Sequence, residues 1–346
     1  MIRAALFGAG NIARRGHLEA LRQAADLAGQ YKVVACCDPV PASLEAIRAE
    51  LPAARLYGTP EALWAAEAPD AVDICAPPDA HAALIRAAVA RGAHVFCEKP
   101  LCRTLAEAAA LDDLLRSRPL AFMPAHQYHH APQWRAVVAA VRAGEIGAPR
   151  CIDWAVWRRE ANPGDPRWRP AWRTDPAIAG GGILMDHGAH VLYQLRELLG
   201  NPLAVTARHQ SLRAERYRVE DTASVIFEYP QAVARLSFTW ASSLREIACR
   251  FVGTEGEIRV ADDRVVLARG GAERELSFAR GLSAGSAHAE WFVPLLREFV
   301  DRVRRKDASR GPWDEALAVL RTLDACYRSH AEGRTVALPT AREVVA

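Results

Sequence analysis

The chain has 346 residues, of which 51% are hydrophobic and 25% are charged, as is usual for a globular protein. Its 44 basic and 41 acidic residues leave a net charge of only +3, which gives no reason to expect nucleic acid or an anionic membrane as a partner. The length is sufficient for two domains of ordinary size.

The eight cysteines are scattered along the chain, and none forms a C-x-x-C pair. Such usage suits a reducing compartment and argues against a disulfide framework. The N-terminus has no basic leader followed by a long apolar core, and the chain has no run of about 18 apolar residues. We therefore expect a cytoplasmic protein without a secretion signal or a membrane span.

Residues 1–125 alternate short apolar runs with alanine-rich helical stretches. Near-continuous apolar character is typical of parallel strands that are covered on both faces. The expected strands are Ile2 to Phe7, Lys32 to Cys37, Ala71 to Cys75, Ala93 to Cys97 and Leu120 to Met123. The expected helices include Ala80 to Arg91 and Leu105 to Arg116. This alternation predicts an α/β fold whose first domain, 1–125, contains a doubly wound parallel sheet.

A glycine-rich turn follows the first expected strand and reads Gly8-Ala9-Gly10-Asn11-Ile12-Ala13. In a G-x-G-x-x-A turn the first glycine permits the tight bend and the second lets a pyrophosphate approach the backbone. The unpaired N–H groups at the start of the next helix favour an anion there. Its position between a strand and a helix predicts a dinucleotide site.

Asp38 follows the second expected strand, somewhat farther along the chain than the usual acidic residue of a dinucleotide site. A carboxylate there can accept hydrogen bonds from both ribose hydroxyls of NAD and would repel the extra phosphate of NADP. The alternative is an ordinary turn aspartate before Pro39. The sequence favours NAD over NADP.

Two further segments follow the ends of expected strands. Ala76-Pro77-Pro78 forms an extended turn where the ribose and nicotinamide of a cofactor would pass. His81 then begins the next helix, and contact with the cofactor and a purely local role remain open for it. Lys99 follows the next strand and is one of only three lysines in the chain. Because arginine cannot give up its proton, a lysine here indicates a task that needs an amine.

After about residue 125 the pattern changes to alternating strands. Thr222 to Tyr229 and Ala232 to Trp240 predict a hairpin. Further expected strands are Cys151 to Trp157, Leu203 to Gln210, Glu246 to Val252 and Gly256 to Val260. One apolar and one polar face indicate an antiparallel-rich sheet with one side covered, and two helical stripes, over residues 292–303 and 316–327, are expected to cover it. We assign 126–346 to a second domain with the site between the two.

Asp186 and His190 are spaced i, i+4 after the glycine run Gly180-Gly181-Gly182. If the segment 185–199 is helical, both side chains lie on one face, one turn apart. The alternative is an ordinary helix start with an aspartate near the positive end of the dipole.

Four motifs together resemble the glucose-fructose oxidoreductase, inositol dehydrogenase and rhizopine-catabolism oxidoreductase family. They are the glycine-rich turn 8–13, the segment Ala76 to His81, Glu98-Lys99-Pro100, and the run from Gly180 to His190. The resemblance implies a Rossmann domain, a second α+β domain with a large, mostly antiparallel open sheet, a nicotinamide cofactor, and sugars or cyclic polyols as substrates. It also implies a homodimer or homotetramer formed through that sheet.

The expected catalytic residues are Lys99, Asp186 and His190. We expect Lys99 and His190 to form the acid/base pair at the reacting oxygen, with Asp186 positioning them. The expected cofactor-binding residues are Gly8, Gly10, Asn11, Ile12, Asp38, Ala76, Pro77, Pro78, His81, Glu98, Lys99, Gln127, Trp172 and Arg173. We expect no metal. Two other activities remain open: an NAD-dependent glycoside hydrolase that uses transient oxidation, and a non-catalytic sugar sensor.

Two other clusters are less specific. His126, His129 and His130 do not have a recognised zinc spacing and are expected to be loop or pocket histidines. A segment rich in tryptophan and arginine is able to stack on a sugar ring and clamp an anionic group, or to form an arm between subunits. Its members are Trp154, Trp157, Arg158, Arg159, Arg167, Trp168, Arg169, Trp172 and Arg173.

Overall fold

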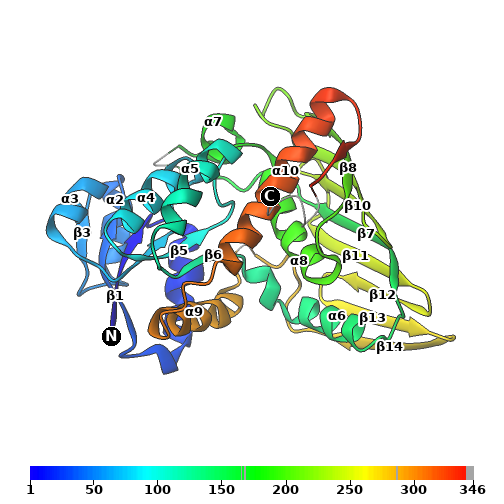
Figure 1. Ribbon diagram of the computed structural model, residues 1–346, viewed down its shortest axis with the longest axis horizontal. Coiled ribbons are helices and arrows are strands. Elements are labelled where there is room, and N and C mark those ends of the chain that lie inside the picture. The colour runs from blue at the N-terminus through cyan, green and yellow to red at the C-terminus, as the bar shows by residue number, and fades with distance from the viewer. Residues whose placement is uncertain (165, 167–168, 286, 340–346) are drawn as a thin grey trace.

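The computed structural model describes residues 1–164, 166, 169–285 and 287–339. The chain there forms two β-sheets with helices packed around and between them (Figure 1). Among the helices of these residues, none combines the length and the apolar character that a membrane span requires.

The first sheet is parallel throughout, with the order β3-β2-β1-β4-β5-β6. Its strands are β1 (Ile2–Phe7), β2 (Tyr31–Cys37), β3 (Arg55–Tyr57), β4 (Ala71–Ile74), β5 (His94–Glu98) and β6 (Phe122–Ala125). The helices between them are α1 (Glu19–Gln23), α2 (Pro41–Arg48), α3 (Pro60–Ala66), α4 (Pro78–Ala90) and α5 (Leu105–Arg116). The predicted doubly wound sheet is confirmed, and the short edge strand β3 was not predicted.

The second sheet is mostly antiparallel, with the order β14-β13-β12-β11-β7-β10-β9-β8-β15, and only β7 and β10 pair in parallel among its described strands. Its longer strands are β7 (Pro149–Trp157), β8 (Ala204–Gln210), β9 (Thr222–Glu228), β10 (Val233–Thr239), β11 (Glu246–Gly253) and β12 (Gly256–Ala261). Three others escaped prediction: β13 (Arg264–Arg269), β14 (Ala272–Ser277) and β15 (Val336–Ala337). The hairpin β9–β10 is confirmed.

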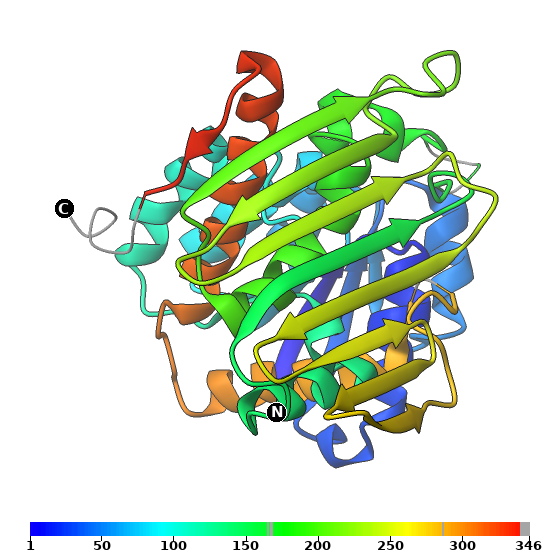
Figure 2. The same cartoon turned by 90° about the vertical axis from the view of Figure 1, so that its right-hand side faces the viewer.

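Side chains of β9 and β10 alternate between buried and exposed along each strand, because only one face of this sheet is covered. The covering helices are α6 (Pro132–Arg142), α8 (Ala189–Leu199) and α10 (Gly311–Glu332). The helix α7 (Pro176–Ala179) is a single short turn. Figure 2 shows the opposite face of the sheet turned toward the viewer without helices over it.

The helix α9 (Ala289–Arg304) corrects one expectation. Its apolar stripe was expected to cover the second sheet, but Phe292, Leu296 and Phe299 pack in one cluster with Leu6 and Phe96 of the parallel sheet. Figure 1 shows α9 beside that sheet. An apolar stripe indicates that a helix face is buried, but it does not indicate against which sheet. The boundary between 1–125 and 126–346 stays a prediction. Residues of α9 belong to the second range in the chain but pack against the sheet of the first.

Candidate functional site

A cleft lies between the two sheets, and nearly all residues that were predicted to be catalytic or cofactor-binding line it. Those lining it are Gly8, Gly10, Asn11, Ile12, Asp38, Ala76, Pro77, Pro78, Glu98, Lys99, Gln127, Trp172, Arg173, Asp186 and His190. Many of them follow the carboxyl ends of β1, β2, β4 and β5, and that edge is where open α/β sheets bind ligands.

The glycine turn has the shape that a dinucleotide site needs. Gly8 has a φ of +94°, and a Cβ on it would lie 2.8 Å from the backbone of Cys75 and Ala76, so only glycine fits. A Cβ on Gly10, in contrast, would meet nothing within 4 Å. Because Gly10 borders the cleft at the start of a helix, the open space suits a diphosphate close to the backbone.

The Asp38 carboxylate is fixed beside this turn. It accepts a hydrogen bond from the backbone N–H of Ala9 at 2.8 Å and another from Val40 at 2.8 Å. These contacts orient the carboxylate at the end of β2, where it borders the cleft.

His81 does not line the cleft, unlike the other nominated residues. It is fully buried, and its ring nitrogens lie 2.9 Å from the Pro100 carbonyl oxygen and 2.8 Å from that of Ala76. Burial lowers the pKa of His81, against the effect of these carbonyls. Of the two roles left open for it, the geometry therefore corresponds to the local one: the ring holds together the loops after β4 and β5.

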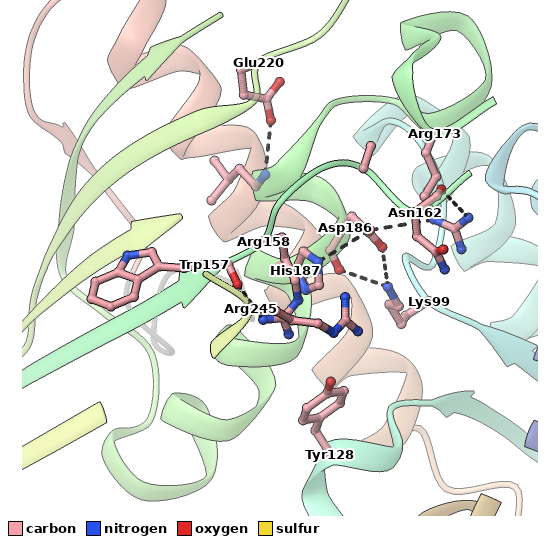
Figure 3. A network of polar contacts seen from close by, with 12 residues as sticks. Lys99, Tyr128, Trp157, Arg158, Asn162, Arg173, Asp186, His187, Glu220 and Arg245 are labelled. Atoms are coloured by element: carbon pink, nitrogen blue, oxygen red, sulfur yellow. Dashed lines mark hydrogen bonds and ion pairs between the residues drawn. The ribbon is translucent and has the colours of Figure 1, made fainter. Parts of the chain in front are cut away.

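Lys99 crosses the cleft to Asp186, as Figure 3 shows. Its Nζ donates to the Asp186 carboxylate at 2.8 Å and to the Asp186 carbonyl oxygen at 2.9 Å. Arg173 lies 3.7 Å from the other carboxylate oxygen. Burial raises the pKa of Asp186, but Lys99, His187 and Arg173 together lower it well below its usual range. Asp186 is therefore an ionised, half-buried carboxylate that Lys99 and Arg173 stabilise.

His190 borders the same cleft as a neutral ring. Burial, and then the charge of Lys99, lower its pKa well below the usual value. Burial likewise lowers the pKa of His187 to about 3. The His190 ring packs 4.4 Å from that of Tyr128, measured between centroids.

Asp186 and His190 were expected on one helical face, one turn apart, but a different histidine lies beside the carboxylate. His187, and not His190, is the histidine next to the carboxylate, with Nε2 3.9 Å from Asp186 Oδ2. The reason is a π-helical turn, Leu184–Gly188, that precedes α8 and changes the i, i+4 phase. Neither this turn nor the role of His187 was predicted.

The glycine run is held by a buried carboxylate that the sequence did not single out. The Glu220 carboxylate accepts from the Gly182 N–H at 2.9 Å, from Leu184 at 3.2 Å and from the Tyr327 hydroxyl at 2.8 Å. A Cβ on Gly182 would lie 1.9 Å from the Glu220 carbonyl oxygen. This close approach fixes where the turn that carries Asp186 begins. Figure 3 shows the Glu220 carboxylate bonded to the backbone at the start of that turn.

A second buried network lies beneath the glycine turn. His17 has a ring nitrogen 2.9 Å from an Asp73 carboxylate oxygen and the other 3.0 Å from Glu98. Burial lowers the pKa of His17, but its ion pair with Asp73 raises it well above the usual value. Glu98 in turn accepts the backbone N–H of Lys99 at 3.1 Å. Asp73 was the available sequence signal, because a carboxylate is unusual in a buried parallel strand.

Metal binding has one geometric candidate among the described residues. Ligand atoms of His17, Asp73 and Cys75 lie within 4.8 Å of one another. The hydrogen bonds of His17 account for this arrangement, and burial raises the pKa of the Cys75 thiol, which keeps it protonated. A protonated thiol is a poor metal ligand.

The histidine cluster and the segment rich in tryptophan and arginine have different surroundings. His126 stacks on Tyr193 with 3.6 Å between centroids, and burial lowers its pKa well below the usual value. Arg167 and Trp168 lie outside the described residues. Arg173 packs over the Trp172 ring at 4.2 Å, so these two form one wall of the cleft.

Comparisons with known proteins agree with this architecture. Residues 2–126 match the oxidoreductase family with an NAD-binding Rossmann fold, and residues 134–259 match the GFO/IDH/MocA C-terminal domain. The chain is 30% identical to D-xylose 1-dehydrogenase (NADP(+)) 2 of Haloferax volcanii, over 90% of this chain and 93% of that one. It is 28% identical to inositol 2-dehydrogenase of Rhizobium meliloti, over 97% and 99%.

A solved structure has the same fold. Levoglucosan dehydrogenase in complex with NADH superposes with a TM-score of 0.84 at 20% identity, covering 98% of this chain and 99% of that one. The two family matches and the xylose dehydrogenase likeness span both sheets and the cleft between them. The chain therefore belongs to the GFO/IDH/MocA family of oxidoreductases.

Proposed function

We propose that this protein oxidises a hydroxyl carbon of a sugar or cyclic polyol, or reduces the corresponding ketone, with a nicotinamide cofactor. The observation that carries the proposal is one cleft that joins a glycine turn to Lys99, Asp186 and a neutral His190. Relatives named for xylose and inositol dehydrogenation support the substrate class.

The cleft residues have separate roles in cofactor binding and in proton transfer. Gly8 and Gly10 would hold the diphosphate of the cofactor, and Pro77 and Trp172 border the same cleft. When bound, the nicotinamide accepts or returns the hydride. His190 is uncharged and is therefore able to accept the proton of an alcohol. Lys99, held by Asp186, donates a hydrogen bond to the reacting oxygen.

We infer a preference for NAD over NADP. The Asp38 carboxylate is fixed by two backbone N–H groups beside the glycine turn, where a ribose would lie. A fixed carboxylate there accepts hydrogen bonds from the ribose hydroxyls of NAD and repels the 2′-phosphate of NADP. Arg14, which also borders the cleft, is engaged by Glu50 at 2.5 Å.

Neither alternative activity is favoured by the relatives, which are named as dehydrogenases. A hydrolase that oxidises its substrate only transiently would release product without net NADH, and a sensor would need no acid/base pair. Net NADH absorbance at 340 nm on addition of substrate distinguishes a dehydrogenase from both.

We also propose that copies of the chain associate through the bare face of the second sheet, and that the protein is cytoplasmic. The first proposal is supported by a broad sheet face without helices over it (Figure 2). All eight cysteines are free, which supports the second. Light scattering after gel filtration tests the association, and a monomer at working concentration would contradict it.

The decisive test of the activity is Lys99→Arg. It keeps the charge but replaces the ammonium by a guanidinium whose donors lie in one rigid plane. The hydrogen bond to the reacting oxygen should therefore be lost, and turnover should fall below detection while NADH affinity changes little. Lys32→Arg, at an exposed position on β2, is the matched control and should behave as the wild type. Wild-type turnover by Lys99→Arg would show that the assigned role is wrong.

A further inference from the structure

Two arginines lie beside the Lys99–Asp186 pair, and the proposed reaction does not use them. Figure 3 shows Arg158 and Arg245 between His187 and Tyr128, and all of these residues border the cleft. Arg158 is only 3% exposed. Burial and the neighbouring charge of Arg245 lower its pKa, against the opposite effect of Tyr128, Asp262 and Asp186.

Both guanidiniums are anchored by neutral groups. Arg158 donates to the carbonyl oxygens of Trp157 at 2.9 Å and Glu246 at 3.0 Å. Arg245 donates to those of Ser283 at 2.8 Å and Gly285 at 2.7 Å. Within the described part of the chain, no carboxylate oxygen lies within 4.0 Å of either guanidinium.

Each carboxylate near the two arginines already has another partner. Asp186 binds Lys99 at 2.8 Å, and Glu160 binds Arg216 at 2.5 Å. Asp262 accepts the Ser283 N–H at 2.7 Å. The two histidines of this region, His187 and His190, are neutral, as argued above.

A buried charge is costly without a counter-ion, because it is stable only when it is paired. Arg158 is such a charge, and the exposed Arg245 places a second positive charge on the same cleft. Since the described residues place no carboxylate against either guanidinium, the partner is expected from the ligand. A planar guanidinium matches the paired oxygens of a carboxylate or phosphate, and its anchored edge sets the direction of the remaining N–H groups.

We propose that the substrate carries an anionic group, a carboxylate or a phosphate, which binds between Arg158 and Arg245. The inference rests on the proposed function and narrows it from sugars and polyols in general to sugar acids or sugar phosphates. The competing explanation is that the two arginines only tie loops and strand ends together, and such a role would be indifferent to the charge of the substrate.

The test compares matched acidic and neutral sugars on the full-length protein: D-glucuronate with D-glucose, D-galacturonate with D-galactose, and D-glucose 6-phosphate as the phosphate arm. The wild type should show kcat/KM at least tenfold higher for one acidic class. Arg245→Gln should remove that preference, chiefly through KM, while leaving the neutral sugars within about twofold. Arg159→Gln, at an exposed neighbour of Arg158, is the control.

Thermal shifts with NADH present give a second readout that needs no turnover. An acidic sugar should raise the Tm of the wild type and of Arg159→Gln, but not that of Arg245→Gln. Equal responses to acidic and neutral sugars in both assays would overturn the inference and leave the dehydrogenase proposal intact. An acid-specific shift without net NADH from any sugar would uphold the inference and overturn that proposal.

Discussion

Replacing His17 by glutamine removes the one cation from a buried pair of carboxylates. The side chains of His17, Asp73 and Glu98 are 1%, 3% and 9% exposed. Breaking a buried ion pair by deleting one partner costs about 3 to 5 kcal/mol. We therefore expect His17→Gln to lower the free energy of unfolding by about that amount at pH 7, measured by urea denaturation with linear extrapolation.

The pH dependence separates charge from packing. Because the folded-state pKa of His17 is raised, its contribution is fully present below the unfolded-state value of about 6.5 and is lost as the pH rises through the folded-state value. In that window the wild type should lose about 1.4 kcal/mol per pH unit from this group, and His17→Gln should lack that slope. His209→Gln is the control, since burial lowers the pKa of His209 to about 4.

A double variant tests the mechanism further. In the background of His17→Gln, Asp73→Asn removes one of the two facing carboxylates and should restore more than about 1 kcal/mol, whereas in the wild type it should destabilise. A loss below about 1 kcal/mol in His17→Gln, or additive effects of the two changes, would refute the idea of a buried imidazolium between carboxylates.

Three further outcomes follow from the cleft. Gly10→Ala should leave the urea midpoint unchanged, because a Cβ there meets nothing within 4 Å, yet it should weaken NADH binding at least tenfold in a fluorescence titration; an unchanged Kd would contradict the diphosphate position. Gly182→Ala places its Cβ 1.9 Å from the Glu220 carbonyl oxygen, so it should lower stability by about 1 to 3 kcal/mol and reduce kcat, and full stability with full activity would disprove the constraint. Asp38→Asn should lower the ratio of kcat/KM for NAD to that for NADP, and an unchanged ratio would dismiss Asp38 as the selecting residue.

The elements predicted well from the sequence are those whose signal is local. The strand Ile2–Phe7 and the helix Leu105–Arg116 have the predicted bounds, because each has an uninterrupted apolar pattern and a clear end. The strand Ala272–Ser277 was missed since it lies at a sheet edge, where nearly every side chain is exposed and no alternation arises. The helix Ala289–Arg304 was predicted but packs against the other sheet.

The site residues that were predicted likewise have a local sequence signal, and those that were missed do not. Lys99 and Asp38 were found because they directly follow strands, and parallel strands bring their carboxyl ends to one edge. Arg245 has no such position. It lies directly before a strand of the second sheet, β11, and comes close to Arg158, 87 residues earlier in the chain, only through the folding of that sheet. His17 lies on a helix whose inward face is set by a π-helical turn, Ala13–Leu18, that periodicity does not disclose.

A continuous series of polar contacts joins the two buried networks, and it explains why the amine at its centre is lysine. Asp73 holds His17, His17 holds Glu98, and Glu98 accepts the backbone N–H of Lys99. The Lys99 ammonium has three N–H donors, and Asp186 accepts from it at two oxygen atoms. One N–H therefore remains for the substrate oxygen that we propose Lys99 contacts. The backbone and the side chain of Lys99 are fixed from opposite sides of the cleft. An arginine at this position would keep the charge and lose that geometry, because its donors lie in one rigid plane.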